Sequence, residues 1–168
     1  MSKIAIVLGS SRGDGHTRQL CNYLLESVDA HLIDLNTKSI GHFDYNFENK
    51  NDDFLPTITE LINNYDLLIF ATPVYWYSMS GTLKDFFDRI TDLLKNHKNL
   101  ARKLKGISMA VLSCSSGEDL DDSFALPFIK SAEYLDMKFI SHCHGWIENN
   151  EIPEEVQKRI DIFSTQLK

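Results

Sequence analysis

Residues 9–17 combine glycines, hydroxyl groups and an arginine directly after an apolar run, in the order Gly-Ser-Ser-Arg-Gly-Asp-Gly-His-Thr. Glycines allow a tight turn, hydroxyls form hydrogen bonds, and the free amides at a helix start carry partial positive charge. Arg12 can add a charge-assisted contact to an anion. The segment is therefore a candidate phosphate site that could use the side chains of Ser10, Ser11, Arg12 and Thr17.

Two other interpretations of this segment stay open. Residues 9–13 also read G-x-S-x-G between a strand and a helix, which is the context of a hydrolase nucleophile. A serine esterase would use Ser11, and the acid and base that it needs could come from Asp121, Asp122, His142 and His144. The segment could also be a polar turn in which Thr17 caps the helix. The GxxxxGK[ST] and GxGxxG nucleotide fingerprints do not match it.

A second candidate segment, residues 72–81, carries three large rings in a row. Pro73 stiffens the chain, and the rings of Tyr75, Trp76 and Tyr77 follow it. Such rings favour a flat ligand, with about 0.5–1.5 kcal/mol per aromatic contact beyond area burial. The alternative is that the rings belong to the core or to a subunit interface. If the two segments lie on neighbouring strands, they predict one ligand with a phosphate at one end and a ring system at the other.

Short apolar runs closed by turn residues predict five strands, at 4–8, 31–35, 67–71, 107–112 and 137–140. Apolar residues at three-four spacing predict helices between and after them, within 17–28, 55–65, 83–94, 129–135 and 156–163, with Pro127 in a first turn or at a kink. Strict alternation of strands and helices indicates a parallel α/β sheet with helices on both faces. Ligands of such sheets bind beyond the carboxyl ends of the strands. Residues 36–53 have no sustained period and predict a loop, either a lid or a long connection.

The composition limits the domain number and the kinds of partner that the protein can bind. A length of 168 residues predicts a single domain, residues 1–168. The net charge of −7 disfavours nucleic acid and anionic membranes. Three dispersed cysteines without a CxxC pair predict reduced, buried thiols, no metal or iron–sulfur site, and, with no apparent signal segment, a cytoplasmic protein.

Together, the motifs resemble those of the flavodoxin-like NAD(P)H-dependent FMN reductase and quinone reductase family. The resemblance rests on residues 9–12 with Gly15 and Thr17, and on residues 72–78 with 81–89. It implies a flavodoxin-like, doubly wound five-stranded sheet. It also implies a set of FMN-binding residues: Ser10, Ser11, Arg12, His16 and Thr17 at the phosphate, Pro73, Val74, Tyr75 and Trp76 along the ribityl chain and ring, and Ser115, Ser116 and Gly117 in a third loop. His16 stands where the family more usually has Asn.

The same resemblance implies an activity. No side chain would be catalytic, because the flavin is the reactive group. NAD(P)H would pass a hydride to FMN, and a quinone, azo compound or second flavin would then take the electrons. A flavodoxin-type electron carrier that reduces no substrate is the alternative. The family also implies a homodimer or homotetramer built with the helix at 81–96, in which Phe86 or Phe87 could meet a partner, unless both are core.

Overall fold

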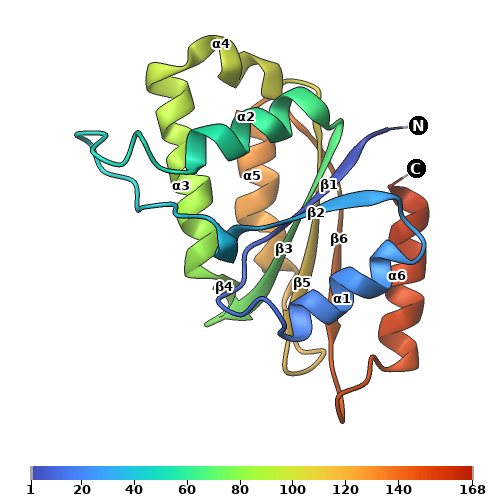
Figure 1. Ribbon diagram of the computed structural model, residues 1–168. Coiled ribbons are helices and arrows are strands. Elements are labelled where there is room, and N and C mark those ends of the chain that lie inside the picture. Colours follow the sequence, from blue (N-terminus) through green and yellow to red (C-terminus); the bar gives the residue numbers. More distant parts are fainter. Residues whose placement is uncertain (1, 168) are drawn as a thin grey trace.

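The computed structural model describes residues 2–167 and contains one mixed sheet flanked by helices (Figure 1). Five strands are parallel, in the order β2-β1-β3-β5-β6, and a short sixth strand pairs antiparallel with β3. Their bounds are β1 (Ile4–Leu8), β2 (Ala30–Asp34), β3 (Leu67–Tyr75), β4 (Ser78–Met79), β5 (Ser108–Ser115) and β6 (Lys138–Trp146). The predicted five-stranded parallel sheet is confirmed, and β4 is an addition that the sequence pattern did not indicate.

Helices cover both faces of the sheet (Figure 1). One face carries α1 (His16–Leu25) and α6 (Glu154–Gln166), and the other carries α2 (Phe54–Asn64), α3 (Gly81–Asn96) and α5 (Leu126–Tyr134). A short α4 (Lys98–Ala101) follows α3, and three 3-10 turns lie at Leu35–Thr37, Arg102–Leu104 and Asp122–Ala125. Pro127 lies in the first turn of α5, as one of the two predictions had it. None of these helices is long and apolar enough to cross a membrane.

The hydrophobic core lies in two layers, one on each side of the sheet. Both layers are apolar because alternate residues of the central strands point to opposite faces, and each face is covered by helices. Within β1, for example, Ala5 and Val7 belong to one layer, while Ile6 and Leu8 belong to the other. The three cysteines are free and buried, as predicted.

Three strands continue beyond their predicted ends. β3 includes Pro73 and Tyr75, which the sequence pattern had placed in a loop. A proline is tolerated there because β1 ends opposite Ala71, so β3 has lost one parallel neighbour at that point. β5 and β6 also run on through polar residues, which hydrogen-bond to one another across the two strands.

Residues 36–53 form an irregular segment fastened to α3, apart from a 3-10 turn at its start. Asp52 forms an ion pair with Arg89, and the Arg89 guanidinium also donates to the carbonyls of Gly41 and Asn49. Arg89 is only 2% exposed. The predicted loop is therefore confirmed, and its ends are held against the helix.

Candidate functional site

A cleft of about 400 Å³ opens at the carboxyl ends of β1, β3 and β5. The cleft lies beside β1, which has β2 as its neighbour on one side and β3 on the other. The connections from β1 to β2 and from β2 to β3 therefore run in opposite directions across the sheet. Ligands of open α/β sheets bind at this switch point. The cleft is lined by Ser10, Arg12, Gly15, His16, Thr17, Pro73, Val74, Tyr75, Cys114, Ser115, Ser116 and Ile147.

The turn after β1 lies tightly against the start of α3. A Cβ added at Gly9 would lie 2.5 Å from the Cβ of Leu83, so no side chain fits at this position. Ser80 fastens the contact from the other side: its hydroxyl donates to the Gly9 carbonyl over 2.6 Å and accepts from the Leu83 amide over 3.1 Å. The first and second candidate segments are therefore joined at the base of the cleft.

The first turn of α1 offers its amides to the cleft. Gly15 is the N-cap of this helix and provides no side-chain cap. Thr17 is therefore not the cap, and the prediction that Thr17 caps the helix is wrong. Uncapped N-terminal amides, together with the Arg12 guanidinium and the hydroxyls of Ser10 and Thr17, form a site suited to an anion.

Tyr75 links the two segments at the mouth of the cleft. Its hydroxyl lies 3.0 Å from the Ser11 hydroxyl, and its ring is among the groups that line the cleft. Ser11 itself does not line the cleft. Since the hydrogen-bonding partner of Ser11 is a tyrosine, the geometry offers no histidine base for an esterase. The histidines that such an enzyme could use, His142 and His144, both contact Ser113 instead.

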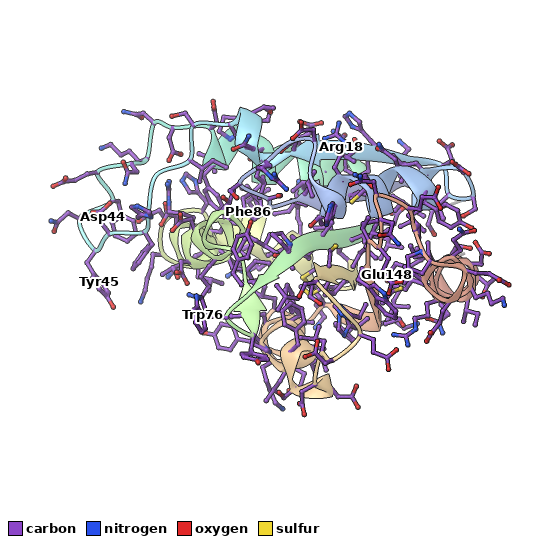
Figure 2. All side chains as sticks on the ribbon, turned by 90° about the horizontal axis from the view of Figure 1, so that it is seen from below. Arg18, Asp44, Tyr45, Trp76, Phe86 and Glu148 are labelled. Atoms are coloured by element: carbon purple, nitrogen blue, oxygen red, sulfur yellow. The ribbon has the colours of Figure 1, made fainter. Side chains whose placement is uncertain are left out.

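Trp76 and Tyr77 form the two-residue turn between β3 and β4. Figure 2 shows Trp76 at the end of β3. Both residues of the turn have positive φ, 49° and 61°, as a two-residue hairpin turn of this type demands. Their side chains are 91% and 75% exposed. Trp76 therefore lies at the rim and does not line the cleft, in contrast to Tyr75.

The third loop begins at the end of β5. Ser115 and Ser116 line the cleft, whereas Gly117 does not. The Ser115 hydroxyl donates to the Gly117 carbonyl over 2.6 Å and accepts from the Gly117 amide over 3.2 Å. This local ring of hydrogen bonds gives the loop a defined shape.

Sequence reasoning missed several residues at the cleft. Cys114 and Ile147 line it, and Ser80 fixes its base. Burial raises the pKa of the Cys114 thiol to about 11, so this thiol stays protonated at neutral pH. A serine directly before a helix is a common N-cap, and this signal could have identified Ser80. Within the described part of the chain, no group of acidic, cysteine and histidine side chains could hold a metal ion.

The fold and this cleft define an α/β protein with an anion site beside an aromatic rim. Residues 2–149 match the model of the NADPH-dependent FMN reductase family, and the chain belongs to this family. The prediction of an FMN-dependent oxidoreductase that uses NAD(P)H is thereby confirmed.

Relatives and solved structures agree with this assignment. The chain is 32% identical over 139 residues to YwqN of Bacillus subtilis, provisionally named as an NAD(P)H-dependent FMN-containing oxidoreductase, covering 79% of this chain and 76% of that protein. It is 30% identical over 100 residues to the FMN-dependent NADPH-azoreductase of Staphylococcus aureus, about half of each chain.

Among solved structures, the Trp repressor binding protein of B. subtilis matches with a TM-score of 0.75 and 24% identity over 99% of this chain and 98% of that chain. An FMN-dependent NADH-azoreductase of Bacillus anthracis in complex with FMN matches with a TM-score of 0.67 and 14% identity over 99% of each chain. At these identities the two structures show the shared, flavodoxin-like fold.

Proposed function

We propose that the protein is an NAD(P)H-dependent oxidoreductase that binds FMN in this cleft and reduces a flat acceptor such as a quinone, an azo compound or a flavin. The observation that carries the proposal is the cleft itself, because one cavity is lined by both an anion site and a tyrosine. FMN has a phosphate and a flat ring system in one molecule. We propose residues 1–168 as its single FMN-binding domain.

The phosphate end of the cleft would hold the dianion through the first turn of α1. The uncapped amides of this turn and the Arg12 guanidinium supply positive charge, and hydroxyls supply directed hydrogen bonds. We assign to this end Ser10, Ser11, Arg12, His16 and Thr17. Ser11 would act through Tyr75, which it contacts.

The other end would hold the ring system between β3 and the third loop. The residues that we assign here are Pro73, Val74, Tyr75, Trp76, Ser115, Ser116 and Gly117. When bound, FMN supplies the hydride and electron transfer. The chain orients the ring, and the exposed rim at Trp76 and Tyr77 leaves room for NAD(P)H and the acceptor to enter in turn.

A spectroscopic titration tests the proposal. FMN added to the protein should shift and sharpen its visible absorbance, and anaerobic mixing with NADPH or NADH should bleach the bound flavin. A quinone or azo dye added afterwards should restore the yellow colour. Protein that binds no FMN would refute the proposal, and bound FMN that neither nucleotide bleaches would favour an electron carrier.

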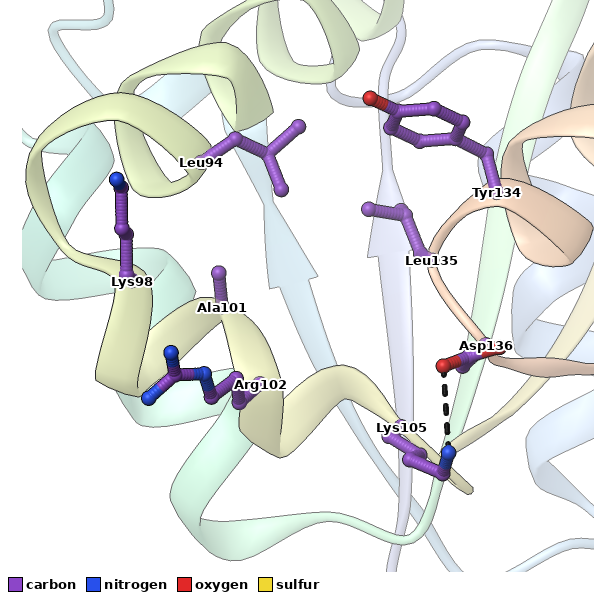
Figure 3. A pocket seen from close by; sticks show the side chains of 8 residues that line it. All are labelled: Leu94, Lys98, Ala101, Arg102, Lys105, Tyr134, Leu135 and Asp136. Carbon is purple, nitrogen blue, oxygen red and sulfur yellow. Dashed lines mark hydrogen bonds and ion pairs between the residues drawn. The ribbon is translucent and has the colours of Figure 1, made fainter.

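We propose that the protein assembles as a homodimer or homotetramer through α3 and α5. Two adjoining hollows border these helices, and Leu94, Tyr134 and Leu135 contribute to both. The first also extends over α4 and is lined by charged side chains as well as apolar ones. Figure 3 shows the first, where Lys98 and Arg102 border an apolar floor. The ring of Tyr134 is exposed in the single chain, which supports a surface that a second subunit would cover.

Phe86 and Phe87 themselves pack inward. Phe86 is fully buried against Phe54, and Phe87 lies edge-on to Phe70 and Phe128. The surface to test as a subunit interface is therefore the hollows near Phe87 and not the Phe87 ring. Light scattering should give a molar mass that is a multiple of the chain's 19.3 kDa, and the variant Tyr134→Asp should have a lower molar mass. The buried, free cysteines support a reducing, cytoplasmic location.

A further inference from the structure

A partly buried chain of polar groups connects β5 and β6 on the face of the sheet that α5 covers. His142 Nε2 lies 2.7 Å from Ser113 Oγ, and Ser113 Oγ lies 2.9 Å from His144 Nδ1. On its other side, His144 Nε2 lies 2.9 Å from the Gly117 carbonyl and 3.2 Å from Ser115 Oγ. The four side chains therefore form one continuous series of hydrogen-bonding groups.

The partners fix the direction of these hydrogen bonds. The Gly117 carbonyl only accepts, so His144 Nε2 carries the proton and Nδ1 of the neutral ring accepts. Ser113 must then donate to His144 and accept from His142 Nε2–H. Ser113 and the His144 ring thus each accept at one side and donate at the other, and His142 donates from Nε2. This is the arrangement that proton transfer along a chain requires.

The two ends of this chain open into different clefts. Ser115 lines the FMN cleft. His142 and His144 both line a second cleft of about 330 Å³ at the free edge of β6, between residues 118–122 and α6. Both ring nitrogens of His144 already have hydrogen-bonding partners, so the nitrogen left for water is Nδ1 of His142. Water that reaches the edge cleft can therefore exchange protons with His142, while the FMN cleft receives them at Ser115.

We propose that His142, Ser113, His144 and Ser115 are a proton relay that carries one proton per turnover from the edge of the sheet into the FMN cleft. This inference rests on the proposed function. In the overall reaction, NAD(P)H, one proton and the acceptor A give NAD(P)⁺ and AH₂, so the nicotinamide supplies two electrons with one proton, and water supplies the second proton.

The transfer balances at each atom. A proton from water binds His142 Nδ1, and the Nε2–H proton passes to Ser113 as the hydroxyl proton of Ser113 passes to His144 Nδ1. His144 then passes its Nε2 proton to Ser115, whose hydroxyl turns away from the Gly117 carbonyl and releases its own proton into the cleft. Each member gains one proton and loses one, which leaves both rings as Nδ1–H tautomers that must return to the Nε2–H form before the next turnover.

The surroundings keep the rings neutral at pH 7, as a relay needs. Burial and the neighbouring His144 lower the pKa of His142 to about 4, which Asp122 only partly opposes. Burial likewise lowers the pKa of His144, beside Arg159 and Asp119. Phe124 stacks on His142, and Glu118 also borders the edge cleft. A neutral imidazole can donate and accept at once, whereas an imidazolium only donates.

Histidine NMR of the FMN-free protein tests the geometry without any activity. Nitrogen shifts at pH 7 should show His142 and His144 as neutral Nε2–H tautomers. Ser113→Ala should change the shifts of both rings, while His97→Gln, at an exposed position, should change neither. A charged His144, or a His144 protonated at Nδ1, would overturn the assignment.

Stopped-flow kinetics test the relay. The variants Ser113→Ala and His142→Gly should bind FMN and be bleached by NAD(P)H at the wild-type rate, because that step takes a hydride and needs no proton from water. Reoxidation by a quinone should slow at least tenfold, and the solvent isotope effect on it should change. Added imidazole should restore the rate of His142→Gly through the open edge cleft, and His97→Gln should behave as wild type.

The proposed function and the relay are refuted by different results. Wild-type protein that binds no FMN, or is not bleached by NAD(P)H, refutes the proposed function together with the relay. Wild-type behaviour of both relay variants in reoxidation refutes the relay alone. A slower reoxidation that imidazole does not restore, with an unchanged isotope effect, would mean that these side chains only support the fold, and would also refute the relay.

Discussion

Arg89 of α3 and Asp52 of the irregular segment 36–53 form a nearly buried ion pair, with 2.6 Å between Nη1 and Oδ2. The same guanidinium donates through Nε to Asp92 over 2.7 Å. Burial alone would raise the pKa of Asp52, but hydrogen bonds from Arg89 and from the amides of Gly41 and Phe54 outweigh it and lower the pKa. The pair therefore couples a long connection to the core helix.

Removing the Arg89 guanidinium should destabilise the fold. Arg89→Met leaves Asp52 and Asp92 as uncompensated, largely buried charges, and we expect the free energy of unfolding to fall by about 3–5 kcal/mol. Urea denaturation measures this. The control is Lys84→Met, which breaks an exposed pair with Asp88 on the same helix and should cost less than about 1 kcal/mol. Equal losses in the two variants would contradict the structural role of Arg89.

The phosphate site can be tested at one side chain. Arg12→Ala should weaken FMN binding by about 1.5–3 kcal/mol, or about 10- to 150-fold, because a charge-assisted contact is lost. Arg18→Ala is the matched control, since Arg18 lies on α1 but pairs with Asp34 and does not line the cleft. Fluorescence titration with FMN gives both affinities. An Arg12 variant of wild-type affinity would place this guanidinium away from the phosphate.

The depressed pKa of His142 should make stability depend on pH. Its folded pKa of about 4 lies below the ordinary value of 6.5, so the unfolded chain binds the proton first as the pH falls. Stability therefore decreases from about pH 7 down to pH 4, by about 2 kcal/mol at pH 5. His142→Gln should remove this part of the slope in urea denaturation. An identical slope in both proteins would show that His142 titrates normally in the fold.

The hairpin turn of β3 and β4 should hold conformational strain. A left-handed backbone costs a non-glycine residue roughly 1–2 kcal/mol, so Tyr77→Gly should raise the free energy of unfolding by about 1 kcal/mol. Tyr45→Gly is the control, because Tyr45 is also exposed but lacks a positive φ. Glycine should be neutral or destabilising there. Thermal unfolding of both variants decides the point.

Sequence patterns predicted the central strands well because they are apolar on both faces, as in β1. The patterns did not predict the parts of strands that consist of polar residues. Ser113 and His144 lie side by side in β5 and β6, and the hydroxyl of one satisfies the ring of the other. Such partners are far apart in sequence, so periodicity alone could not identify them. The same holds for Ser80, whose partner Gly9 is 71 residues away.

The cleft residues were predicted in most cases, because glycines, Arg12 and Tyr75 follow strand ends that parallel topology brings together. Trp76 shows the limit of that reasoning. The rings of Tyr75 and Trp76 are adjacent in sequence, but a turn that begins between them sends one to the cleft and the other to the rim. The sequence does not indicate a turn at these two positions, because residues with positive φ in such turns are usually glycine or asparagine and not aromatic.

The contact between Gly9 and Leu83 has a consequence for anyone who wishes to redesign this protein. With only 2.5 Å available to a new Cβ, every substitution at position 9 must push α3 away from the turn, which would widen the floor of the cavity and loosen its grip on any occupant. Libraries intended to broaden the range of electron acceptors should keep this glycine fixed and place their diversity at residues 76 and 77, where side chains project freely.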